Sequence, residues 1–174
     1  MRFENGEIRL EKVTEDHVPF ICRINLDVMP RKRSEGFFET FYQLPVAEDY
    51  CLAAVHYEDD DSQYGFLFHE PKRRVAGFIY AAKRLSLSIQ SIAVAKRFQR
   101  HGVGSMLLNA VVAKAGESEI HTAPIPEGDG FAEAGLFFRL NGFRLDRLER
   151  VRTYPGSPKI KYQGYIYKHL KEKP

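Results

Sequence analysis

The stretch that decides the fold is residues 85–108, LSLSIQSIAVAKRFQRHGVGSMLL, in which a strand pattern changes into a helix pattern. Apolar side chains occupy the odd positions up to Ile89 and then the even positions from Ile92 onward. Because side chains in a strand alternate with a period of two, this slip predicts a β-bulge at Gln90 and Ser91. The backbone groups that a bulge leaves unpaired need another partner, which is an out-of-register strand, water or a ligand.

A basic turn that contains two glycines follows this strand and opens a helix. The turn reads Gln99-Arg100-His101-Gly102-Val103-Gly104-Ser105, and apolar residues then recur at helical spacing until Ala115, with Gly116 as the stop. Consecutive N–H groups at a helix N-terminus, with no Cβ at two positions, suit a phosphate or pyrophosphate group. The turn lacks the third glycine of the dinucleotide fingerprint and the Gly-Lys-Ser/Thr of a P-loop.

The rest of the chain predicts an alternation of strands and helices without a low-complexity linker or an internal repeat. Thr14 is an expected N-cap, Pro30 ends the helix that follows it, and Ser34 is a second expected N-cap. Further strands are expected at 7–13, 50–57, 66–68, 75–82 and 119–125, and a final strand contains Tyr165 and Tyr167.

Composition narrows the class of protein. The chain has 174 residues, a length that suits one domain over 1–174, and its net charge of +3 is too small to indicate a nucleic-acid binder. It has no apolar run of the roughly 20 residues that a membrane span needs, and no signal-peptide pattern at its start, so we expect a cytoplasmic protein. The two cysteines, Cys22 and Cys51, are expected to be reduced core residues, and no residue spacing predicts a metal site.

The bulged strand followed by Q-x-x-G-x-G resembles the acetyl-CoA signature of the GNAT acetyltransferase superfamily. A second block, Phe131 to Phe143, is similar to the next helix of that family, which ends in a Gly-Phe pair that enters a strand. Residues 24–38 have a fainter similarity to the first two helices of protein N-terminal acetyltransferases.

The resemblance implies an α/β (α+β) class and the GNAT fold. That fold is a mixed, mostly antiparallel sheet of six to seven strands, splayed at a β-bulge, with about four helices distributed over both faces. Two parallel strands, expected at Leu85–Ala95 and Glu119–Ile125, separate at the bulge, and the co-substrate acetyl-CoA lies between them.

The resemblance also implies which residues hold acetyl-CoA. The backbone of the bulged strand bonds the pantetheine arm as an added strand does, and N–H groups of the glycine turn hold the pyrophosphate. For Lys96 and Arg97, a role near the phosphates and simple solvation are equally compatible with the sequence. The residues expected to bind acetyl-CoA are Ile92, Ala93, Val94, Gln99, Arg100, His101, Gly102, Val103, Gly104, Ser105 and Phe138.

For catalysis the chain departs from the family pattern. Phe138 stands where the family usually has a tyrosine acid, and Gln90 stands where some members have a glutamate base, so Gln90 is limited to orienting a water. The catalytic candidates are therefore His121 as base, Gln90, and Tyr165 as a replacement for the tyrosine. The alternatives are a structural strand histidine and an amphipathic edge strand that contains Tyr165 and Tyr167.

The expected function is direct transfer of an acetyl group from acetyl-CoA to a primary amine of a protein N-terminus, a lysine or a small amine. Because the tyrosine is missing, a second function stays possible from the sequence, namely a catalytically silent acyl-CoA-binding module that regulates a partner. A nucleic-acid binder is disfavoured because no aromatic residues are interleaved with the basic clusters. We expect no membrane partner, and either a monomer or a homodimer.

Overall fold

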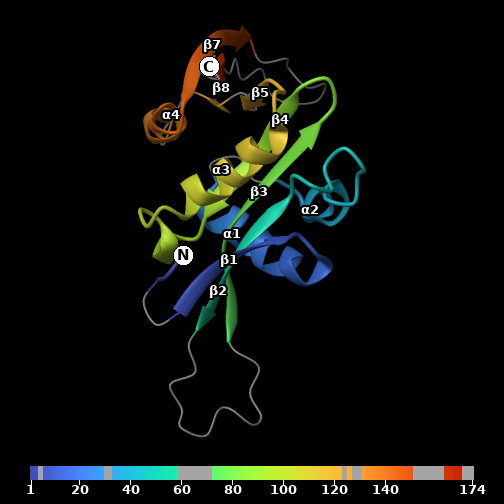
Figure 1. The fold of residues 1–174 in the computed structure, drawn as a ribbon, viewed down its shortest axis with the longest axis vertical. Coiled ribbons are helices and arrows are strands. Elements are labelled where there is room, and N and C mark those ends of the chain that lie inside the picture. Colours follow the sequence, from blue (N-terminus) through green and yellow to red (C-terminus); the bar gives the residue numbers. More distant parts are fainter. Residues whose placement is uncertain are drawn as a thin grey trace, which may run out of the picture.

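One mixed sheet forms the framework of the chain (Figure 1). The computed structural model describes residues 1–3, 6–29, 33–58, 72–122, 125–126, 131–150 and 163–169. The described strands lie in the order β1-β2-β3-β4-β5-β8-β6, and β7 pairs with the other edge of β8. Their bounds are β1 Gly6–Lys12, β2 Leu52–Glu58, β3 Arg73–Lys83, β4 Leu87–Val94, β5 Ile120–Thr122, β6 Ile125–Pro126, β7 Phe143–Arg150 and β8 Gln163–His169.

The pairing confirms the expected mixed, mostly antiparallel sheet. Strands β1 to β4 pair antiparallel in chain order, and β4 and β5 form the one parallel pair among the described strands. The sheet has eight described strands, more than the expected six to seven. The expected strand 119–125 contributes two of them, since β5 pairs with β4 and β8 whereas β6 pairs with β8 alone. The strand expected at 66–68 lies outside the described residues.

Helices cover both faces of the sheet, as expected. Their bounds are α1 Val18–Val28, α2 Glu35–Phe41, α3 Val103–Ala115 and α4 Phe131–Leu140, and two short 3₁₀ segments, Glu15–His17 and Lys96–Phe98, precede α1 and α3. Helices α1 and α2 pack on one face, in a cluster of buried side chains that includes Ile21 and Phe38. Helices α3 and α4 contribute to a second cluster on the opposite face (Figure 1).

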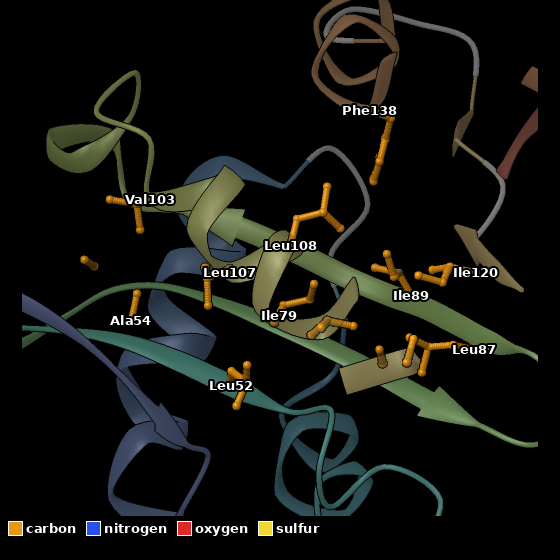
Figure 2. Close-up of a cluster of buried hydrophobic side chains, with 14 of the residues drawn as sticks. Leu52, Ala54, Ile79, Leu87, Ile89, Val103, Leu107, Leu108, Ile120 and Phe138 are labelled. Atoms are coloured by element: carbon orange, nitrogen blue, oxygen red, sulfur yellow. The ribbon is translucent and has the colours of Figure 1, made fainter. Parts of the chain in front are cut away.

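The second cluster joins the N-terminal and C-terminal halves of the chain. Figure 2 shows Leu107 and Leu108 of α3 among side chains of β3, β4 and β5, with Phe138 of α4 reaching toward the same cluster. Apolar burial of this extent on each face fixes the position of β3 and β4 between the helices. The strand β4 therefore has a packed layer on both of its sides.

Local sequence sets the helix ends. The backbone of Gly102 has φ 82° immediately before α3, and Gly116 has φ 60° immediately after it, a region that side chains rarely adopt. Ser34 caps α2, because its hydroxyl oxygen accepts a hydrogen bond from the Phe37 N–H at 3.3 Å. The predicted stop at Gly116 and the predicted N-cap at Ser34 are both confirmed.

Candidate functional site

The β-bulge lies at the predicted position in β4. On β3, Tyr80 is opposite Ser91 and the next residue, Ala81, is opposite Ile89, so Gln90 is an extra residue without a partner in this register. An extra residue in one strand bends it and changes the face on which the following side chains lie.

The bulge changes which positions of β4 lie toward α3, from odd numbers before it to even numbers after it. The positions that are most buried do not follow this change. Before the bulge, Leu87 and Ile89 belong to the α3 cluster, and after it Ile92 and Val94 pack against the same cluster. Ser91 and Ala93 are nonetheless the buried residues after the bulge, whereas Ile92 and Val94 are only half-buried. The expectation that even positions become the buried ones is wrong, because helices α1 and α2 cover the other face.

Parallel pairing of β4 ends just before the bulge. The described pairs with β5 are Leu87 with Ile120, Ser88 with His121 and Ile89 with Thr122. Strand β4 then continues for five residues, from Gln90 to Val94, with no further partner on β5 among the described residues. This stretch includes Ile92, Ala93 and Val94, whose backbone the family resemblance assigns to the pantetheine arm.

The turn before α3 has the geometry of an anion cradle. We call residues 99–105 the cofactor loop. Within it, Arg100 has φ 63° and Gly102 has φ 82°, with no positive φ at His101 between them. Alternation of left-handed and right-handed residues directs successive N–H groups into one concavity, which is a recurrent phosphate-binding arrangement.

The first turn of α3 adds donors to this cradle. The first intrahelical hydrogen bond runs from the Met106 N–H to the Gly102 carbonyl at 2.9 Å. The N–H groups of Val103, Gly104 and Ser105 therefore have no partner within the helix. The exposed residues Lys96, Arg97 and Arg100 lie in the segment directly before α3 and add positive charge to it. These residues fit the pyrophosphate and phosphate groups of a CoA thioester.

The cofactor loop is held in place by side chains beneath it. The Gln99 amide donates to the Val94 carbonyl at 2.9 Å, which joins the loop to the end of β4. The ring of Phe3 lies 4.8 Å from both the Phe98 and the His101 rings, and the buried His56 ring lies 5.4 Å from Phe98. The N-terminal residues thus lie beside the loop that precedes α3 (Figure 1). Sequence reasoning did not find Phe3 or His56.

Two adjacent aromatic residues of α4, Phe137 and Phe138, have different surroundings. Phe138, which the sequence assigned to cofactor binding, is 5% exposed and packs on Phe143 at 5.4 Å, which leaves it little surface for a ligand. Phe137 instead meets the cofactor loop, because a Cβ placed on Gly104 would lie 3.2 Å from its ring and 3.6 Å from Val94. Gly104 thus allows α3 to approach α4 and β4 closely.

The opposite side of β4 carries a row of polar side chains. The register places His121 beside Ser88, on the face away from the α3 cluster, and Gln90 follows two residues after Ser88. The Gln90 amide donates to the Ser88 hydroxyl at 2.7 Å. His121 is half-buried, and its Nε2 lies 3.4 Å from the carboxylate of Glu119, another residue that sequence reasoning missed.

Arg33 approaches the bulge from the segment between α1 and α2. Its Nη2 donates to the main-chain carbonyl of Gln90 at 3.0 Å. We call the set of Ser88, Gln90, His121 and Arg33 the acceptor face. Arg33 was not among the predicted site residues.

The last catalytic candidate, Tyr165, is located by its backbone only. On β8 it is opposite Ile125 of β6 and Leu148 of β7. Its side chain lies outside the described part of the structure, so its role stays a prediction.

Two further observations concern the described residues as a set. None of their helices has the length and apolar character of a membrane span. They contain no group of three or more His, Cys, Asp or Glu side chains arranged to hold a metal ion.

The chain belongs to the acetyltransferase (GNAT) family, whose sequence model matches residues 23–126, more than half of the chain. Membership of this family makes acetyl-CoA the co-substrate and acetyl transfer the general activity, as the cofactor loop and the bulged strand indicate. A search of curated proteins returns no match.

Solved structures share the fold at low sequence identity. Arabidopsis thaliana Naa50 in complex with the bisubstrate analogue CoA-Ac-MVNAL is 16% identical, with a TM-score of 0.67 over 94% of this chain and 99% of that one. Arabidopsis thaliana NAA60 in complex with a bisubstrate analogue is 12% identical, with a TM-score of 0.69 over 95% and 100%. The ribosomal-protein-S18-alanine N-acetyltransferase from Escherichia coli is 17% identical, with a TM-score of 0.62 over 93% and 92%.

Proposed function

We propose that this protein is an N-acetyltransferase that moves the acetyl group of acetyl-CoA directly onto a primary amine, with the N-terminal amine of a peptide as the leading acceptor. The observation that carries the proposal is the change of face at Gln90. Because of it, one face of β4 presents the apolar, half-buried side chains of Ile92 and Val94 on the side of α3, and the other face presents polar side chains on the side of α1 and α2. A donor and an acceptor can then approach the same peptide unit from opposite sides.

The proposed donor side uses backbone groups. Ile92, Ala93 and Val94 offer strand N–H and C=O groups to the pantetheine arm, and the cofactor loop offers N–H groups to the pyrophosphate. When bound, acetyl-CoA supplies a thioester carbonyl that a neutral amine attacks, so that a C–N bond forms and the C–S bond breaks. A backbone N–H at the bulge is the proposed donor to the carbonyl oxygen as negative charge develops on it.

The proposed acceptor side uses side chains. An amine is largely protonated at neutral pH and must lose a proton before it attacks. His121 is the proposed general base, because it lies on the acceptor face beside Ser88 and carries a carboxylate neighbour in Glu119. Gln90 and Ser88, which are hydrogen-bonded to each other, are proposed to orient a water in the same row.

The choice of a peptide acceptor draws on the structural likenesses. The bisubstrate analogue CoA-Ac-MVNAL bound to Naa50 and the alanine named for the Escherichia coli enzyme both indicate amines at peptide ends. A lysine side chain or a small amine stays a second acceptor class. We propose a single catalytic domain that works in the cytoplasm.

The second candidate is a silent acyl-CoA-binding module, and one specific observation favours it. Phe138, at the position of the usual tyrosine acid, is a buried core residue without a titrating group.

An acceptor panel separates the two candidates. Purified protein and acetyl-CoA are incubated with one acceptor at a time. The acceptors are peptides that differ in their first two residues, an N-terminally blocked lysine peptide, and spermidine. Thiol release and mass spectrometry of the acceptor are followed together, and the acetyl-CoA dissociation constant is measured by calorimetry. Acetylation at the amine of at least one acceptor supports the enzyme. Tight acetyl-CoA binding without turnover on every acceptor supports the module instead.

A further inference from the structure

The segment between α1 and α2 is attached to the bulge of β4 through one arginine. Arg33 donates from Nη2 to the Gln90 carbonyl at 3.0 Å, across 57 positions of sequence. A guanidinium donor makes this a charge-assisted hydrogen bond, which is stronger than one between neutral groups. Gln90 is the one residue of β4 that the register with β3 leaves without a partner.

The backbone of Arg33 is itself fixed by a buried side chain. Asn25 of α1 is 1% exposed, and its amide donates to the Arg33 carbonyl at 3.1 Å while its oxygen accepts from the Arg33 N–H at 3.2 Å. One side-chain amide thus bonds both main-chain groups of the same residue, as a neighbouring strand would. Breaking either bond inside a buried site leaves a polar group unsatisfied, which is costly.

The guanidinium end of Arg33 is fixed by an aromatic ring. Its Cζ lies 4.7 Å from the centroid of the Phe37 ring on α2. A cation at this distance over a ring face is attracted by the ring quadrupole. Arg33 is therefore held at its backbone by α1 and at its guanidinium group by both α2 and β4.

Fixing the Gln90 carbonyl also fixes the N–H group that follows it. A peptide unit is planar and trans, so the Gln90 C=O and the Ser91 N–H lie in one plane and point in opposite directions. This is the peptide unit at which β4 changes face and at which its pairing with β5 has ended. A rotation of that unit would redirect the backbone groups on which the proposed reaction depends.

We propose that Arg33 is a positioning residue that sets the orientation of the Gln90–Ser91 peptide unit at the bulge, and that Asn25 holds it for this task. The inference rests on the proposed function only for its catalytic consequence. The orientation of the peptide unit is measurable on the protein without any reaction.

The test compares Arg33→Met, which keeps an unbranched apolar side chain but removes the donor and the charge above Phe37, with Arg23→Met as the matched control on an exposed arginine of α1. Without ligand, the Ser91 amide is expected to shift in the NMR spectrum and to exchange its hydrogen at least threefold faster in Arg33→Met than in the control. With ligands, the turnover number is expected to fall about tenfold while the acetyl-CoA dissociation constant stays within twofold.

Two further variants keep the proposal falsifiable if folding is affected. Arg33→Lys retains the charge and is expected to recover part of the lost turnover. A cycle with Asn25→Leu is expected to be non-additive, because both substitutions remove the same constraint. A Ser91 amide and a turnover number that match the control would overturn the proposal. If the folded wild-type protein acetylates no amine, the proposed function is wrong. The exchange rate of the Ser91 amide then still decides whether Arg33 orients the peptide unit.

Discussion

The cofactor loop and the acceptor face lie on either side of one strand, but they are made of different chemical groups. The cofactor loop presents main-chain N–H groups, ordered by two positive φ values at Arg100 and Gly102. The acceptor face presents side chains from three separated segments, which meet at β4. A site made of backbone depends on local sequence, whereas a site made of side chains depends on the packing of distant segments.

If this contrast is right, a substitution on the acceptor face changes the rate of transfer and one in the cofactor loop changes binding. The largest effect is expected for His121→Ala. Loss of a general base typically costs 10²- to 10⁴-fold in turnover number, while the acetyl-CoA dissociation constant stays within about twofold. Steady-state kinetics between pH 5 and 9, with calorimetry, measure both.

A second histidine provides the control for this experiment. His101 is exposed in the cofactor loop, so His101→Ala is expected to weaken acetyl-CoA binding by a few fold and to leave the turnover number close to wild type. Wild-type turnover in His121→Ala, accompanied only by a lower melting temperature, would show that His121 is a structural residue.

The next largest effect is expected for Gly102→Ala. The φ of 82° at Gly102 disfavours any side chain by roughly 1–2 kcal/mol, which corresponds to about a tenfold weaker acetyl-CoA complex if the loop relaxes. Turnover at saturating acetyl-CoA is expected to stay close to wild type. The matched control is Gly36→Ala, since an added Cβ there meets only the end of the Glu39 side chain, at 3.9 Å. Equal affinity of the two variants for acetyl-CoA would show that the cofactor loop does not bind acetyl-CoA.

A smaller effect on the same side is expected from the aromatic support below the loop. Phe3→Leu removes ring contacts with Phe98 and His101, both at 4.8 Å, but keeps an apolar side chain. We expect the acetyl-CoA dissociation constant to rise about two- to fivefold, because a looser loop must be ordered by the ligand. The turnover number is expected to be unchanged. A fall in turnover without a change in affinity would break the contrast between the two sides.

The smallest effect, one on stability alone, is expected for His17, which belongs to neither side. Burial, and then the nearby Arg73 charge, lower the pKa of His17, and Glu11 opposes them. The unfolded chain therefore binds more protons below a pH of about 6.5, so this contribution to stability is present above that pH and is lost as the pH falls. His17→Gln is expected to reduce the loss of melting temperature between pH 7 and 5 and to leave kinetics unchanged. An unaltered pH dependence of melting would contradict this assignment.

Sequence patterns predicted the features that depend on neighbouring residues. The bulge at Gln90 follows from a slip in a period-two pattern, and the stop of α3 follows from Gly116. The helix begins at Val103, two residues before the start that the pattern indicates after Gly104. Each of these signals is complete within about ten residues. The presence of a glycine-containing turn between β4 and α3 was therefore predictable, whereas its binding of acetyl-CoA stays a prediction.

The acceptor face was predictable only in part, because its contacts cross long stretches of sequence. Arg33 is 57 residues from Gln90, and nothing in the order of residues pairs the two. One signal was present. Asn25 is a polar residue next to Ile24 on the buried side of an apolar helix, and such a residue needs a partner that the fold must supply. The burial of Phe138 in place of Phe137 also depends on how α4 rotates against α3, which helical spacing does not determine.

The single extra residue in β4 also separates what the fold requires from what the site requires. Removing Gln90 would make Ile89 and Ser91 neighbours in sequence, as their partners Ala81 and Tyr80 on β3 already are. Regular alternation would then leave Ile92 and Val94 on the side of α3, and Ala93 on the side of α1 and α2, where they lie now. A deletion would remove only the unpaired residue and the carbonyl to which Arg33 donates. A chain without residue 90 is therefore expected to keep both packed layers and a straighter β4, but to lose the bulge.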